Sequence, residues 1–207
     1  MSGSFGGLTM MKCVPAGGAG KTGKPAPLVV ALHGYTQTAQ AYQDTTEWHV
    51  LGGRAAVAGG PYGCTTGCMS AGKGDAEAVK AAFPTWWNDA SKRKPRLLVV
   101  QGDKDNIVSP TNLGESVKQW LAATGTDPAP ANAKLGIAKE LKGYPYAVYS
   151  KDGSSVSVAS LTVTGMAHAT PVDPGTAPDQ GGKTGSYAAT EKVYSAYCIA
   201  KFFGLIP

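Results

Sequence analysis

Two short apolar runs most constrain how this chain can fold. Residues 28–32 (LVVAL) lie between a proline and His33, and residues 97–100 (LLVV) end two positions before Gly102. Apolar runs of this length, closed by turn residues, are typical of strands buried on both faces of a parallel sheet. Both are far shorter than the ~20 apolar residues that a membrane-spanning helix needs. The sequence therefore predicts a sheet built around these two strands.

Helical and strand-like patterns alternate along the rest of the chain. We expect strands at residues 7–14, 28–32, 54–60, 96–101 and 155–164, and helices at 38–51, 75–83, 112–122 and 191–203. Strands separated by helices predict an α/β fold with a mainly parallel sheet flanked by helices. The chain has 207 residues and no internal repeat or linker, which favours one domain over residues 1–207.

The composition favours a folded protein and argues against nucleic-acid binding. Hydrophobic residues make up 43% of the chain and charged residues 16%, which excludes a disordered polyelectrolyte. The net charge is +5, yet the only dense cationic stretch is residues 92–96, and no aromatic residues alternate with it. We interpret this stretch as a solvated loop, and we expect neither a nucleic-acid partner nor a membrane partner.

The cysteines favour disulfides over a metal site. The four cysteines are Cys13, Cys64, Cys68 and Cys198. A metal site would combine paired cysteines with histidines at set spacing, whereas all three histidines lie far from Cys64 and Cys68. Two disulfides are the better interpretation, and they imply an oxidising compartment. Of the three possible pairings we favour Cys64 with Cys68 and Cys13 with Cys198, and we predict no metal site.

Chemically useful residues follow three of the predicted strands. Gly34 allows a sharp turn after the first buried strand and presents the Tyr35 N–H, which is suited to binding an oxyanion. Asp103 and Asp105 follow residues 96–101, and His168 follows residues 155–164 in a loop rich in glycine and proline. Open α/β sheets place their chemistry at these strand ends. The order acid, then histidine, each after its own strand, is that of an α/β-hydrolase triad.

Five stretches carry a resemblance to a known family. They are residues 27–39 (PLVVALHGYTQTA), 56–64 (AVAGGPYGC), 102–112 with its acid loop, 165–175 (GMAHATPVDPG) and 199–205 (IAKFFGL). In combination they resemble the secreted polyhydroxybutyrate-depolymerase and feruloyl-esterase-like branch of the α/β-hydrolases. The resemblance implies that Asp105, not Asp103, is the triad acid, that His168 is the general base, and that the Tyr35 N–H is one oxyanion donor.

The resemblance also implies an activity. Members of this branch hydrolyse esters in polyesters or in plant cell walls, need no cofactor and are exported. We expect an ester as substrate, polymeric or not, and an extracellular protein, although no signal peptide follows Met1 in this chain. Trp86 and Trp87 are adjacent and would point to opposite faces of a strand, so we expect at most one, Trp86, to line a substrate-binding face and the other to pack in the core. The oligomeric state stays open.

The chain departs from this family at the nucleophile. A serine esterase needs a Gly-x-Ser-x-Gly elbow directly after a strand, and no such motif is present. The nearest match surrounds Ser70, but its first glycine, Gly67, is one residue too early, and Ser70 lies ten residues beyond the strand that ends at Gly60. We do not assign Ser70 as the nucleophile.

The nucleophile segment is absent rather than mutated. Two strand–helix units, about 60 residues, are missing near residues 51–55, which leaves about five strands instead of about eight. A natural shortening, an engineered deletion and an incompletely recorded sequence all fit. The first hypothesis is a carboxylic-ester hydrolase, and the alternative is a catalytically inactive remnant that binds a polymer or a partner.

Overall fold

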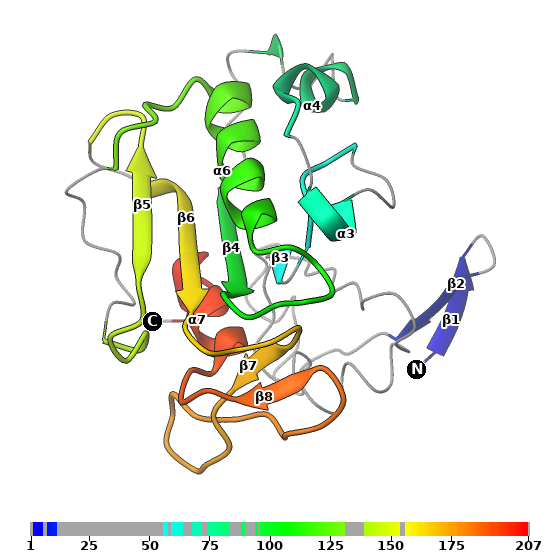
Figure 1. Cartoon of the computed structure of the whole chain (residues 1–207), viewed down its shortest axis with the longest axis vertical. Coiled ribbons are helices and arrows are strands. Elements are labelled where there is room, and N and C mark those ends of the chain that lie inside the picture. Colours follow the sequence, from blue (N-terminus) through cyan, green and yellow to red (C-terminus); the bar gives the residue numbers. More distant parts are fainter. Residues whose placement is uncertain are drawn as a thin grey trace, which may run out of the picture.

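The computed structural model describes a sheet and the helices that pack on it (Figure 1). The residues that it describes are 2–5, 8–11, 56–57, 59–63, 68–71, 74–82, 88–89, 94, 96–130, 139–153 and 156–206. The strand expected at residues 28–32 and the helix expected at 38–51 lie outside these ranges, as does the junction near residues 51–55.

Strands and helices alternate in the described part of the chain. The strands are β1 (Ser2–Phe5), β2 (Leu8–Met11), β3 (Ala56–Val57), β4 (Leu97–Gly102), β5 (Tyr146–Ser150), β6 (Val156–Val163), β7 (Thr170–Val172) and β8 (Ala188–Thr190). The helices are α3 (Cys68–Ala71), α4 (Ala76–Ala82), α6 (Thr111–Thr124) and α7 (Ser195–Phe202). None of these helices is both long and apolar enough to cross a bilayer.

The main sheet has the strand order β3-β4-β6-β5. β4 pairs in parallel with β3 on one side and with β6 on the other, whereas β5 runs antiparallel to β6 at the edge. Parallel neighbours place the carboxyl ends of β3, β4 and β6 at one edge of the sheet. The predicted α/β fold with a mainly parallel sheet flanked by helices is therefore confirmed.

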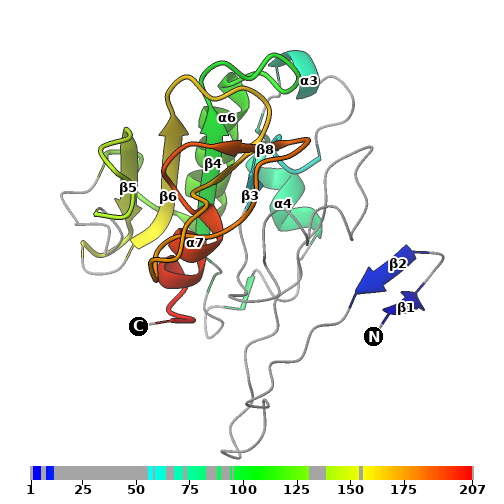
Figure 2. The ribbon, with the colours of Figure 1, turned by 90° about the horizontal axis from the view of Figure 1, so that it is seen from below.

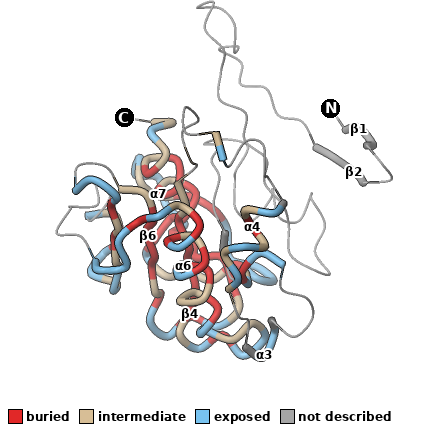
Figure 3. Tube along the Cα trace, turned by 90° about the horizontal axis from the view of Figure 1, so that it is seen from above, coloured by how far each residue is buried: buried red, intermediate tan, exposed pale blue. Residues whose placement is uncertain are grey.

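The two faces of β4 bury against different helices, as the alternation of a strand requires. Leu98 and Val100 belong to the buried cluster that contains Ile199 of α7. Val99, which points to the opposite face, packs with Val117 and Leu121 of α6. Figure 2 shows α6 and α7 on either side of the sheet, and Figure 3 shows the buried residues concentrated along β4, β6 and the two helices. The described core is thus a helix–sheet–helix sandwich.

Side-chain hydrogen bonds attach the segment after β3 to α6. Gln119 is buried; its Oε1 accepts a hydrogen bond from the Tyr62 N–H at 2.8 Å, and its Nε2 donates to the carbonyls of Tyr62 and Asp75, each at 2.8 Å. Val79 of α4 packs beside Ala123 of α6. These contacts hold the loop after β3 and the start of α4 against α6.

Several elements differ from the expectations, and β1, α3, β7 and β8 were not expected at all. The first predicted strand is real over Leu8–Met11, but it pairs with β1 in a separate two-stranded sheet. β5 was not expected; it is a short edge strand whose register with β6 shifts at Tyr149/Ser150. The last helix begins at Ser195 rather than at 191, because Lys192 has a positive φ of 57° and Glu191 donates its N–H to Val172.

One disulfide prediction is wrong. Cys198 lies on α7 as a buried free thiol, 2% exposed, and is not bridged to Cys13. Burial raises the pKa of this thiol from 9.0 to about 12, because the interior disfavours the thiolate. The Cys64–Cys68 pair stays a prediction, since Cys64 and Cys13 lie outside the described residues. Cys198 is a core residue because α7 places it among apolar side chains.

The cationic stretch also differs in one part from the expected solvated loop. Arg96 places its guanidinium 4.7 Å from the ring centroid of Phe202, at the end of α7. Such cation–π contacts attach a charged head to an aromatic face. Arg96 therefore helps to anchor the last helix. Lys92 and Arg93 lie outside the described residues.

Candidate active site

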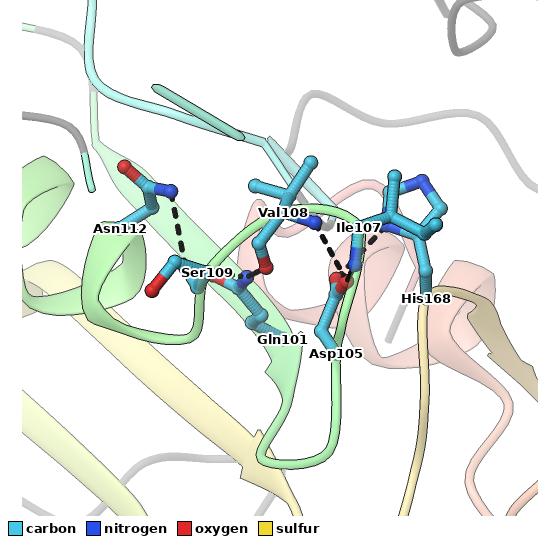
Figure 4. Close-up of polar contacts among 7 residues, drawn as sticks. All are labelled: Gln101, Asp105, Ile107, Val108, Ser109, Asn112 and His168. Carbon is cyan, nitrogen blue, oxygen red and sulfur yellow. Dashed lines mark hydrogen bonds and ion pairs between the residues drawn. The ribbon is translucent and has the colours of Figure 1, made fainter. Parts of the chain in front are cut away.

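The acid loop turns tightly after β4 around the carboxylate of Asp105. Asp105 Oδ1 accepts hydrogen bonds from the backbone N–H of Ile107 at 2.9 Å and of Val108 at 2.8 Å. A short acidic side chain that accepts from residues two and three positions ahead is a typical turn former. The same bonds leave Oδ2 available on the other side of the carboxylate (Figure 4).

Two amide side chains hold the far end of this loop. Gln101 is buried in β4, and its Nε2 donates to the carbonyls of Val108 at 2.8 Å and Ser109 at 3.1 Å. Asn112, fully buried at the start of α6, donates through Nδ2 to the same Ser109 carbonyl at 3.0 Å. The loop from β4 to α6 is therefore fixed at both ends, which places Asp105 with little freedom.

Backbone bonds join the acid loop to the loop that follows β6. The Lys104 N–H donates to the Met166 carbonyl at 3.1 Å, and the Gly165 N–H donates to Asp103 Oδ1 at 2.7 Å. A side chain on residue 102 would collide with the Met166 carbonyl oxygen, so this close approach requires Gly102. The two loops act as one unit, although Asp103 and Gly165 are 62 residues apart in the chain.

Asp105 and His168 meet at this junction. His168 Nδ1 lies 2.9 Å from Asp105 Oδ2. The Asp105 side chain is fully buried, whereas the His168 side chain is 23% exposed. Because a carboxylate only accepts hydrogen bonds, Nδ1 carries the hydrogen, and in the neutral imidazole the lone pair is then on Nε2. The second ring nitrogen points away from Asp105 (Figure 4). An imidazole oriented in this way can accept a proton from a neighbouring hydroxyl.

The structure distinguishes the two aspartates of the acid loop. Asp105 contacts His168, whereas Asp103 caps the backbone of the histidine loop. The pairing that the sequence led us to expect is present. The catalytic roles of Asp105 and His168 stay predictions, because the geometry by itself reports orientation and not turnover.

The other predicted site residues lie elsewhere or outside the described ranges. Tyr35 and Trp86 fall outside the described residues. Ser70 is exposed within α3, thirteen residues after the described end of β3 at Val57, and so is not on an elbow that follows a strand directly. The neighbouring Met69 carbonyl accepts from the Ser109 N–H at 3.0 Å, which attaches α3 to the acid loop.

One neighbour of the histidine was missed from the sequence. The Tyr187 ring stands edge-on to the His168 imidazole, with the ring centroids 5.7 Å apart and the planes at 82°. No local sequence pattern predicts this contact, because the two residues belong to separate loops that only the pairing of β7 with β8 brings together. Within the described ranges, no group of three or more acidic, histidine or cysteine side chains could hold a metal ion.

Comparison with known proteins adds one relative. The sequence is 35% identical over 165 residues to poly(3-hydroxyalkanoate) depolymerase C of Paucimonas lemoignei, and the match covers 76% of this chain. This chain is related to that depolymerase. The match covers 38% of the length of the depolymerase, so the chain corresponds to part of it. No family model matches the sequence. The predicted likeness to polyhydroxybutyrate depolymerases is confirmed at the level of this relationship.

Proposed function

We propose that this protein is a serine-type carboxylic-ester hydrolase that acts on polyesters of hydroxyalkanoates. The observation that carries the proposal is the hydrogen bond between buried Asp105 and partly exposed His168 at the carboxyl edge of the sheet. The related depolymerase supports the choice of a polyester, because the name of that protein specifies a poly(3-hydroxyalkanoate). Nothing comparable favours feruloyl esters.

The proposed reaction begins with proton transfer to His168. Its Nε2 takes the proton of a serine hydroxyl as the oxygen attacks the ester carbonyl, and Asp105 stabilises the imidazolium that forms. The proton then passes to the leaving alcohol. In the second half, Nε2 activates a water molecule that releases the acid and regenerates the serine. The Tyr35 N–H is proposed as one donor to the oxyanion; losing such a donor typically costs ~3 kcal/mol.

The serine is proposed to belong to residues missing from the 207-residue sequence. The residues that directly follow the described ends of β3, β4 and β6 are Ala58, Asp103 and Thr164, and none of them is a serine. An elbow serine must instead come immediately after a strand. Intact mass spectrometry of the native protein tests this point. A mass well above that of 207 residues supports the proposal, and an equal mass contradicts it.

Active-site labelling tests the hydrolase itself. We expect a fluorophosphonate adduct and turnover of a short-chain nitrophenyl ester, both lost in His168→Ala. A film of poly(3-hydroxybutyrate) and methyl ferulate, compared side by side, should show release of product from the film alone. Labelling that disappears in Ser70→Ala would identify Ser70 as the nucleophile and overturn our exclusion of it.

The inactive remnant makes the opposite prediction. A folded protein with no adduct and no turnover, which still sediments with polymer granules, would replace the hydrolase proposal with a binding domain. Export of the protein is also part of our proposal, and it is tested by locating the native protein in the culture medium or in the cells.

A further inference from the structure

A single hydrogen bond leaves the His168 imidazole incompletely fixed. The bond from Nδ1 to Asp105 positions one ring atom, but the ring can still tilt about that bond and swing Nε2 away from its target. With 23% of the side chain exposed, close packing does not immobilise the ring on every side. Placement errors of about 1 Å can cost ~100-fold in rate, so a second contact on the ring matters for the proposed chemistry.

We propose that Tyr187 is the positioning residue that supplies this second contact. Its ring meets the imidazole edge-on at 5.7 Å, a favourable geometry for aromatic pairs. Tyr187 is 42% exposed, so its ring is not a core side chain that happens to pass the histidine. The proposed role of Tyr187 is to orient His168, and it involves no contact with the substrate.

The pairing of β7 with β8 explains why these two residues meet. Thr170 pairs with Ala188 in the parallel register of the two strands. His168 lies two residues before Thr170, and Tyr187 lies one residue before Ala188. The Thr170 N–H also donates to the Tyr187 carbonyl at 2.8 Å. The small sheet therefore brings the two side chains into contact.

The backbone of Tyr187 indicates that this placement is imposed. Gly185 and Ala188 exchange two hydrogen bonds of 3.0 Å, which makes residues 185–188 a tight turn. Tyr187 is the second central residue of the turn and has a φ of 64°. Positive φ is rarely adopted by bulky residues and is usually left to glycine or asparagine. An exposed tyrosine at such a position strains the turn while presenting an aromatic ring to His168.

Substitutions at residue 187 separate positioning from a merely structural role. Tyr187→Asn removes the ring and places a residue that tolerates positive φ, whereas Tyr187→Phe keeps the ring. Lys192→Asn is the matched control, because Lys192 also has positive φ (57°) and lies outside the acid and histidine loops. For each variant, the measurements are the exchange of the His168 Nδ1 proton with water by NMR, the melting temperature, and kcat and KM for a soluble nitrophenyl ester.

In Tyr187→Asn we expect the His168 Nδ1 proton to exchange about 10-fold faster and kcat to fall about 5-fold to 10-fold. KM should stay within about 2-fold, and the melting temperature should be no lower than that of the parent protein. Tyr187→Phe and Lys192→Asn should stay within about 2-fold in exchange and kcat. Unchanged exchange in Tyr187→Asn would overturn the proposal, as would a fall in exchange protection that merely follows a fall in melting temperature.

The kinetic part of this inference rests on the proposed hydrolase, whereas the exchange measurement does not. If no variant hydrolyses the ester, the proposed function fails, and the Nδ1 exchange rates still decide whether Tyr187 positions the imidazole.

Discussion

Directional polar bonds hold the carboxyl edge of β4 and β6, whereas apolar burial holds the face of the sheet under α7. At the edge, Asp103 accepts a hydrogen bond from the Gly165 N–H, and Asp105 bonds to the His168 ring. Gln101 donates to the Val108 carbonyl of the acid loop. Under α7, Ile199 and Leu98 are at most 1% exposed within one continuous cluster. The same sheet thus carries two regions built on different physical principles.

The difference has consequences for stability and for geometry. A hydrogen bond contributes about 1 kcal/mol net, because water competes for the same groups, but it fixes distance and direction. A fully buried aliphatic side chain contributes about 1.5–3 kcal/mol without specifying orientation. Substitutions at the edge should therefore change the proposed activity more than the stability, and substitutions under α7 should do the reverse.

The largest effect is expected at the acid. In Asp105→Asn, Oδ1 can still accept from Ile107 and Val108, but an NH₂ group faces His168 Nδ1 and forces the wrong tautomer. We expect kcat for a nitrophenyl ester to fall about 10⁴-fold. Asp103→Asn is the matched control and should lose less than about 10-fold, because the amide oxygen can still accept from Gly165. Equal losses in both variants would contradict the distinction between the two aspartates.

The core should show the opposite behaviour. Ile199→Ala removes three carbons from a fully buried site on α7, and we expect the free energy of unfolding to fall by about 2–5 kcal/mol. Urea unfolding measures this change, with Ile199→Val as the milder control at about 0.5–1.5 kcal/mol. The activity per folded molecule should stay the same. A selective loss of kcat would show that the core also sets the geometry of the edge.

Gly102 tests how closely the two loops must approach. In Gly102→Ala the new methyl group collides with the Met166 carbonyl, which pushes the histidine loop away from Asp105. We expect about a 100-fold loss of kcat and a loss of about 2–3 kcal/mol in stability. Gly114→Ala on α6 is the control, since nothing lies within 4 Å of the added carbon. It should stabilise the helix by about 1 kcal/mol. Full activity in Gly102→Ala would show that the loops move independently.

The smallest effect concerns Cys198 and pH. Burial raises its pKa in the folded protein to about 12, against 9.0 for a solvent-exposed thiol, so above pH 9 the unfolded chain loses a proton that the folded protein retains. This contribution to stability is complete below pH 9 and is lost as pH rises, by about 1 kcal/mol between pH 9 and pH 10. Urea unfolding at several pH values measures the slope, which should be shallower in Cys198→Ala. A Cys198 found in a disulfide after denaturation without reductant would contradict the free thiol.

Local patterns predicted the central elements well. β4 and α6 agree with their expected ranges to within two residues, because a glycine ends the strand and Val117 and Leu121 recur at helical spacing. β5 escaped notice because an edge strand of five residues with a shifted register has little periodicity. The start of α7 was misplaced because residues 191–194 continue the amphipathic pattern of the helix, whereas Glu191 donates its N–H to Val172 of β7 and Lys192 has a positive φ.

Two residues of the candidate site could be found without a structure. An acid loop and His168 follow strands, and strand ends at one edge of a parallel sheet meet by geometry, so their order along the chain suggested a pairing. The choice of Asp105 over Asp103 came from the family resemblance. The structural parts of Asp103, Gln101 and Tyr187 could not be found. Asp103 and Tyr187 depend on a partner in another loop, and Gln101 depends on how its own loop folds back to bring the Val108 carbonyl to its side chain. No spacing along the chain encodes these partners.

By itself, then, the sequence determined the α/β class, the buried strand β4 and the positions of an acid and a histidine, because apolar periodicity and glycine turns act over a few residues. The tertiary structure decided that Asp105 rather than Asp103 faces His168, that Cys198 is a core thiol, and that a strained Tyr187 stands beside the imidazole. These outcomes arise from contacts between segments distant in the chain, which strand register and loop packing select.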